Sequence, residues 1–176
     1  MTQLIGILGA MVLVCGAAYP IKSFAHPIHS MKNWLFAIGG FLMLIYSVLN
    51  YLNGGPVFFI FLQGLINISS IFMLSNTPEK TSTPLIISGS LGLVAWSLSL
   101  FEGYNTLFFI IGLSAIALGY ILAPGTCKRN LSLTLGSLLI ALFSFFVNNY
   151  IFLWLNLFFA VFSGYYSWKL RKQLLH

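Results

Sequence analysis

Long runs of apolar residues, each free of charged side chains, follow one another along most of this sequence. Only 6% of the 176 residues are charged, whereas a soluble domain carries about 25%, so the chain lacks the charge to cover a surface that faces water. Runs of about 20 apolar residues cross a bilayer, and backbone polar groups in lipid must be satisfied within the segment. The sequence therefore predicts an all-α membrane protein.

Clusters of Pro, Gly, Asn and charged residues divide the chain into seven apolar segments. Such clusters interrupt helices, and the shortest interruption is the pair Asn148-Asn149. We expect seven transmembrane helices, at residues 4–19, 33–52, 56–75, 84–101, 105–123, 131–148 and 150–168.

All eight Lys and Arg residues fall on one side of the membrane if the chain crosses it seven times. Basic residues collect in cytoplasmic loops, so we expect the N-terminus outside and the C-terminus in the cytoplasm. The short loops favour the bacterial inner membrane. The basic residues are Lys22, Lys32, Lys80, Lys128, Arg129, Lys169, Arg171 and Lys172.

Small residues recur with the same spacing in two predicted helices. Gly9 and Gly16 lie seven residues apart, as do Gly112 and Gly119. Seven residues are nearly two helical turns, so each pair lies on one face, and small faces let membrane helices approach closely. The match continues in order, from Gly39 and Tyr46 to Gly136 and Phe143, and from residues 56–63 to residues 149–156.

This order predicts two parallel three-helix repeats plus a connector helix, a 3+1+3 arrangement. The expected parts are residues 1–76, 77–104 and 105–176. Because one helix separates the triplets, both cross the membrane in the same direction, and an axis along the membrane normal relates them.

Two local motifs resemble known membrane families. Tyr19-Pro20-Ile21-Lys22, followed by Trp34, is similar to the end of the first helix in PQ-loop repeats, with Ile21 in place of the glutamine. With the 3+1+3 arrangement, this resembles the SWEET and PQ-loop superfamily of small-solute carriers. Residues 33–76 resemble the lipid-A-disaccharide synthase N-terminal-type membrane domain, through Gly39-Gly40, Tyr46, Gly55-Pro56-Val57-Phe58 and Gln63-Gly64. The second resemblance implies a link to envelope-lipid and glycosyl-transfer proteins.

Amide side chains inside the predicted spans are the candidate binding residues. Gln63 and Asn67 lie four residues apart, on one face of the third helix, and Asn156 occupies the repeat position of Gln63. The SWEET resemblance implies that such amides line a solute pocket, where Tyr46 replaces the family's tryptophan. The alternative is that they bond the backbone or one another and hold the helices together.

Several classes of function lack the residues they need. The only acidic residues, Glu79 and Glu102, fall on opposite sides of the membrane, so no carboxylate pair can flank a substrate, and we expect neither an enzyme nor a cofactor. Dispersed basic residues give no nucleic-acid-binding face. His26 and His29 have no Cys, Asp or Glu nearby to complete a metal site. A solvated loop is the expected setting, and pH sensing stays open.

Two functions remain. The first is a passive facilitator of a small polar, mostly uncharged solute, working by alternating access between the repeats. The second is a non-transporting membrane module that binds lipid or an envelope-lipid or glycosyl-transfer partner. Both place the chain in the lipid bilayer. Both functions are compatible with a homo-oligomer and with a complex with a membrane partner.

Overall fold

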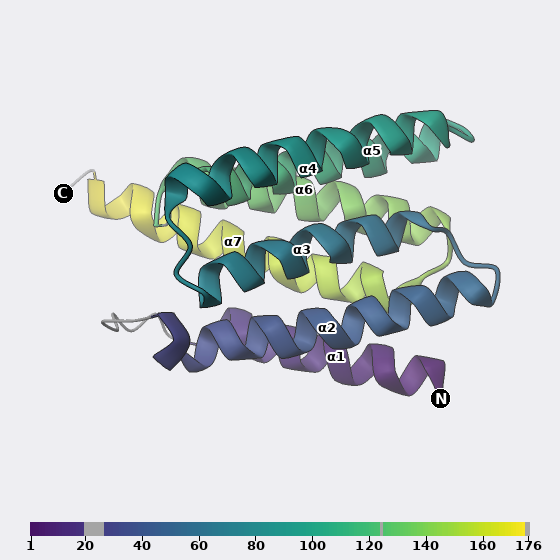
Figure 1. The fold of residues 1–176 in the computed structure, drawn as a ribbon, viewed down its shortest axis with the longest axis horizontal. Coiled ribbons are helices and arrows are strands. Elements are labelled where there is room, and N and C mark those ends of the chain that lie inside the picture. The colour runs from purple at the N-terminus through teal and green to yellow at the C-terminus, as the bar shows by residue number, and fades with distance from the viewer. Residues whose placement is uncertain (20–26, 124, 175–176) are drawn as a thin grey trace. The chain divides into compact units, whose positions relative to one another are not determined.

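The computed structural model describes residues 1–19, 27–123 and 125–174, and these form seven α-helices and one 3-10 turn, η1 (Pro27–His29) (Figure 1). The chain divides into two compact units, Met1–Ile86 and Ile87–His176. The helices are α1 (Thr2–Ala18), α2 (Met31–Leu52), α3 (Phe58–Leu74), α4 (Glu79–Ser99), α5 (Tyr104–Ile121), α6 (Cys127–Phe146) and α7 (Tyr150–Leu174).

Five of these helices, α2 and α4 to α7, are long and apolar enough to cross a membrane. Helices α1 and α3 are also apolar but have only 17 residues each. The prediction of an all-α integral membrane protein is therefore confirmed.

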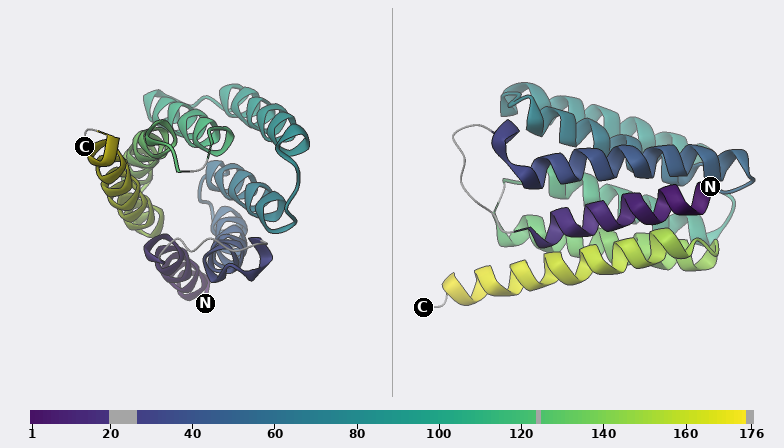
Figure 2. Two further views of the ribbon diagram at one scale, coloured as in Figure 1. Left: turned by 90° about the vertical axis from the view of Figure 1, so that its left-hand side faces the viewer. Right: turned by 90° about the horizontal axis from the view of Figure 1, so that it is seen from below.

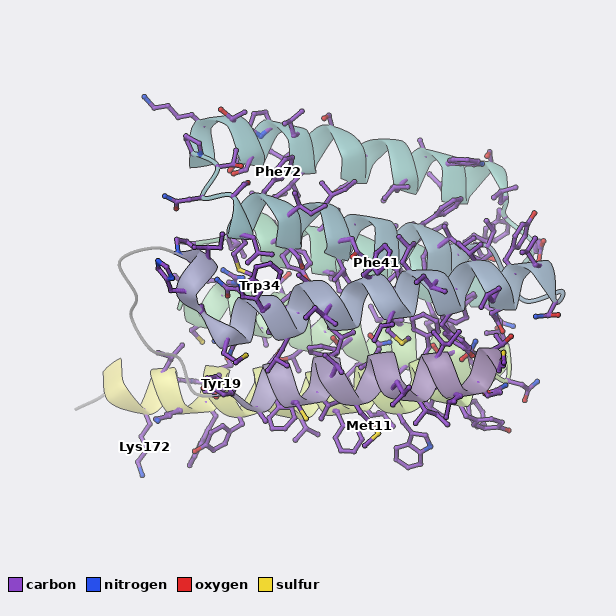
Figure 3. All side chains as sticks on the ribbon, turned by 60° about the horizontal axis from the view of Figure 1, so that its bottom comes forward. Met11, Tyr19, Trp34, Phe41, Phe72 and Lys172 are labelled. Carbon is purple, nitrogen blue, oxygen red and sulfur yellow. The ribbon has the colours of Figure 1, made fainter. Side chains whose placement is uncertain are left out.

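Exposed apolar side chains recur at helical spacing on the outside of the helices. Met11 of α1 and Phe41 of α2 are 59% and 58% exposed, and Figure 3 shows both on the ribbon. In contrast, the buried polar residues of the described chain are all Ser, Thr, Asn or Gln. An apolar outside with uncharged polar groups inside suits a protein surrounded by lipid. On α7 the exposed row is Tyr150, Trp154, Phe158, Val161, Tyr165 and Trp168.

The predicted helix positions agree with the structure to within a few residues, with three larger differences. Two are at the starts of α4 and α6, and the third is at the end of α7, which runs six residues beyond the predicted end at Trp168. Helix α4 begins at Glu79, five residues before the predicted start at Pro84. Pro84 therefore lies inside α4 as its sixth residue, where it lacks the N–H that would bond to the carbonyl of Lys80. Helix α6 begins at Cys127 and includes Lys128 and Arg129. Charged residues near a helix end lie at the membrane surface and do not stop the helix.

In the first unit, α1 packs against α2, and α2 packs against α3 (Figure 2). Glycines let α1 and α2 approach closely. A Cβ added at Gly39 would lie 2.8 Å from the backbone nitrogen of Leu13, and one added at Gly9 would lie 3.1 Å from the backbone nitrogen of Met43. The backbones are therefore too close for a side chain at Gly39.

In the second unit, α5 packs against α6, and α6 packs against α7. A Cβ added at Gly136 would lie 2.6 Å from Cγ1 of Ile116 and 2.9 Å from the carbonyl oxygen of Gly112. A Cβ added at Gly112 would lie 3.0 Å from Cδ1 of Ile140. Glycine is therefore required where α5 and α6 meet, as it is where α1 and α2 meet.

Three helices end in the same kind of turn. One is α3, where Asn76 has φ of +52° and the N–H of Thr77 donates to the carbonyl of Phe72 at 3.0 Å. Gly54 follows α2 with φ of +88°, and Asn148 follows α6 with φ of +54°. The N–H of Gly55 donates to the carbonyl oxygen of Asn50, and the N–H of Asn149 donates to the carbonyl oxygen of Ser144, both at 2.9 Å. This is the Schellman arrangement, in which a left-handed residue closes the helix end. The short break between α6 and α7 that the sequence predicts is confirmed.

Candidate functional site

Gln63 lies in α3 with its side chain 1% exposed. Its Oε1 atom is buried and accepts no hydrogen bond from any described residue. An unpaired polar group inside an apolar helix bundle costs free energy. Gln63 is therefore a residue whose presence packing alone does not explain.

Asn67 lies one turn further along α3 and is half-buried. Its Nδ2 atom donates to the carbonyl oxygens of Gly40 in α2, at 3.0 Å, and of Gln63, at 2.7 Å. Two carbonyl partners fix the orientation of the amide, because only the NH₂ group can donate to both. The Oδ1 atom of Asn67 is left as an acceptor, and a Cβ added at Gly40 would lie 3.4 Å from it.

Tyr46 lies on α2, six residues beyond Gly40, and is 2% exposed. Helices α2 and α3 form an antiparallel hairpin (Figure 1). Tyr46 is therefore displaced from Gly40 along the hairpin in the same direction as Gln63 is displaced from Asn67. The structure thus places Tyr46, Gln63 and Asn67 on one pair of packed helices, with Tyr46 and Gln63 on the same side of the Asn67–Gly40 hydrogen bond.

Asn156 lies in α7 of the second unit and is 5% exposed. Its Nδ2 atom donates to the carbonyl oxygen of Phe152, 2.8 Å away and one turn earlier. The N–H of Phe152 is itself bonded to Oδ1 of Asn149, the residue before α7, at 3.2 Å. Asn156 therefore has a partner within its own helix, unlike Gln63. The solute-binding role of all four residues stays a prediction.

Two buried serines match in the predicted repeat but were not among the candidate site residues. Ser47 of α2 and Ser144 of α6 are both fully buried, and each hydroxyl donates to the carbonyl four residues earlier, at 2.7 Å, on Met43 and Ile140 respectively. Ser47 follows Gly39 by eight residues and Ser144 follows Gly136 by eight residues, and this equal spacing was the signal available in the sequence.

Among the described residues, no group of three His, Cys, Asp or Glu side chains could hold a metal ion. His29 lies in η1, which is hydrogen-bonded to the start of α2. The Nδ2 atom of Asn33 donates to the carbonyl oxygen of Pro27 at 3.0 Å, and the Nε1 atom of Trp34 donates to the carbonyl oxygen of Ile28 at 2.8 Å. His26, Lys22 and the Pro20-Ile21 pair lie outside the described residues, as does Pro124.

Comparisons with protein-family models, curated proteins and solved structures found no match to this chain. No family is therefore assigned, and the function is argued from the chain's own residues.

Proposed function

We propose that this protein is a passive facilitator that carries a small polar, uncharged solute across the membrane by alternating access between two parallel three-helix repeats. The observation that carries the proposal is the buried, unpaired Oε1 of Gln63 in the middle of α3. Polar groups inside the membrane are costly, and they serve either ligand pathways or contacts between helices. A passing solute would supply the missing donor.

The glycine contacts support the repeat. Gly39 meets Leu13 in the first unit, and Gly136 meets Ile116 in the second. Gly136 lies 97 residues after Gly39, and Ile116 lies 103 residues after Leu13, so the two contacts join matching positions of the proposed repeat. Gly9 against Met43 becomes Gly112 against Ile140 under the same two shifts. Composition alone would not repeat contacts between helices, whereas a duplicated hairpin would.

Burial along the third helix of each unit supports the same conclusion. Phe59 and Phe152 are fully buried, and Gln63 and Asn156 are 1% and 5% exposed. A shift of 93 residues relates both pairs. Leu62 and Leu155, 1% and 3% exposed, follow the same shift. Both helices therefore bury the same face.

Charge supports the seven-span topology within each unit. In the first unit, Lys32 lies in the first turn of α2 and Lys80 in the first turn of α4, so both lie at the end opposite the turn at Gly54. In the second unit, the basic residues begin α6 and end α7, whereas Glu102 precedes α5 at the other end. The positive-inside rule then places the basic end of each unit in the cytoplasm.

The polar atoms of α3 define the chemistry of the solute. Gln63 offers its unpaired Oε1 atom as an acceptor. Asn67 offers its Oδ1 atom, also an acceptor, because its NH₂ group is already bonded to two carbonyls. Acceptors select a solute with hydroxyl or amide donors. All buried polar residues of the described chain are uncharged, so a charged solute would have no counter-ion there.

Solute flux into proteoliposomes tests the proposal directly. The purified protein should admit neutral polyols or amides faster than protein-free vesicles, and Gln63→Leu should abolish this flux. Ser70→Ala is the matched control, because Ser70 is buried in the same helix and its hydroxyl is bonded to the carbonyl of Ile66 at 2.8 Å. The control should keep the flux. A Gln63→Leu protein that transports normally would contradict the proposal.

The second candidate is a non-transporting module that binds lipid or an envelope-lipid or glycosyl-transfer partner. The bonded amides of Asn67 and Asn156 favour it, since both donate to backbone carbonyls as structural amides do. In that case no solute of a broad panel should enter the vesicles, and Asn67→Ala should lower stability with no transport phenotype.

A further inference from the structure

We propose that the paired ends of α6 and α7 form a binding site for the phosphate headgroup of an anionic phospholipid. The site, called the basic end here, is independent of the solute pathway. Its residues are Lys128 and Arg129 in the first turn of α6, and Lys169, Arg171 and Lys172 in the last turns of α7.

A contact between the two helices brings the two basic groups together. Cys127 is the first residue of α6, and its Sγ lies 3.2 Å from Oγ of Ser167 in α7. Lys128 follows Cys127 directly, and Arg171 lies four residues beyond Ser167 on the same face of α7, with Lys169 between them. Because α6 and α7 are antiparallel and packed together, the start of one and the end of the other form one surface.

No acidic side chain of the second unit compensates this charge. Between residues 87 and 176 the sequence contains a single acidic residue, Glu102, which lies at the opposite end, before α5. Lys128, Lys169 and Lys172 are exposed, so their ammonium groups can reach a ligand. The N-terminus of α6 adds the partial positive charge of its backbone N–H groups.

Aromatic residues place the basic end at the depth of lipid headgroups. Tyr165 and Trp168 are 53% and 61% exposed, and their ring centroids lie 6.3 Å apart. The Nζ atom of Lys172 lies 5.7 Å from the centroid of the Trp168 ring, and Figure 3 shows Lys172 projecting from the end of α7. Trp and Tyr gather at membrane interfaces, so these charges lie where phosphates lie.

Phospholipid fits this surface better than free phosphate. Arg and Lys bind phosphate oxygens with charge-assisted hydrogen bonds. The exposed ring of Trp168 lies beside Lys172, and with the exposed ring of Tyr165 it offers an apolar surface to an acyl chain or glycerol. Basic groups at the cytoplasmic ends of membrane helices attract anionic headgroups in this way.

The test is binding of phosphatidylglycerol to the purified full chain in neutral detergent, measured by native mass spectrometry and by the rise in melting temperature. Phosphatidylcholine and inorganic phosphate are the comparison ligands. We expect phosphatidylglycerol to bind and stabilise, and the other two to do neither. Equal protection by inorganic phosphate would overturn the assignment to lipid, and equal binding of phosphatidylcholine would overturn the role of charge.

Two variants with the same loss of charge locate the site. Lys128→Gln with Lys169→Gln should weaken phosphatidylglycerol binding roughly 30-fold, at about fivefold for each basic residue near a headgroup. Lys32→Gln with Lys80→Gln, both in the first unit, should leave it unchanged. If the double variant does not fold, Lys169→Gln alone should weaken binding about fivefold. Equal weakening in both pairs, or none in the first, would overturn the proposal.

Discussion

In the first unit, α3 is bonded to α2 by Asn67, whereas in the second unit the position 93 residues later is Ala160. The second unit has a polar link between α5 and α6, where the hydroxyl of Ser132 donates to the carbonyl of Ala115 at 2.7 Å. Its α6 and α7 are joined at one end, where Sγ of Cys127 lies 3.2 Å from Oγ of Ser167. Both units share glycine contacts between their first two helices, but the bonds made by Asn67 and Ser132 join different neighbouring pairs.

The units differ also in their unpaired atoms. Among the described residues, the buried polar side-chain atoms without a hydrogen-bond partner are Nδ2 of Asn50, Oε1 of Gln63 and Oγ of Ser69. All three belong to the first unit. Both units therefore share close glycine contacts, while the described buried polar atoms without a partner all lie in the first unit.

The largest expected effect concerns the shared glycines. Gly39→Ala and Gly136→Ala should each lower the free energy of unfolding by about 1–3 kcal/mol, the usual cost of overpacking. In both, the added Cβ would lie within 2.9 Å of backbone atoms of the neighbouring helix. The measurement is thermal unfolding in detergent. Gly92→Ala is the control, because a Cβ there meets nothing within 4 Å. Destabilisation by only one of the two substitutions would break the parallel between the units.

A smaller effect is expected at the two cross-helix hydrogen bonds. Asn67→Ala and Ser132→Ala should each cost about 0.6 kcal/mol, the average for such bonds in membranes. Asn67→Ala should loosen α3 from α2, and Ser132→Ala should loosen α6 from α5. Hydrogen exchange of the two helix pairs would show where each protein opens. Equal opening in both units for either substitution would contradict the asymmetry.

The smallest effect on stability is expected at Gln63. Gln63→Leu should leave the melting temperature unchanged or raise it, because Oε1 has no described partner to lose and an apolar side chain of similar size removes an unpaired buried group. The measurement is thermal unfolding beside the flux assay. A marked loss of stability would show that Gln63 is a packing residue.

The number of helices and most of their ends could be predicted, because long apolar runs and their polar breaks are local features of the sequence. The partner of Asn67 could not. The spacing of Gln63 and Asn67 places them on one face of α3, but the bond to Gly40 depends on how α3 is rotated against α2. The contact between Cys127 and Ser167 was missed for the same reason, since 40 residues separate them.

The candidate site could be predicted only in part. Matching positions of Gln63 and Asn156 indicated two equivalent amides, and both are buried. Their difference in hydrogen bonding was not visible in the sequence, because an Asn side chain reaches its own helix backbone readily. That Asn156 bonds to Phe152 while Gln63 stays unpaired on Oε1 follows from side-chain geometry.

The side of the membrane on which each turn lies tests the parallel repeat most directly. Single cysteines would replace Gly54 and Asn148 in a chain whose Cys15 and Cys127 are Ala, and an impermeant thiol reagent would be applied to intact cells. Both turns should be labelled from outside, and a cysteine at Thr77 should be labelled only after the cells are opened. Labelling of Gly54→Cys and Asn148→Cys from opposite sides would contradict the parallel repeat.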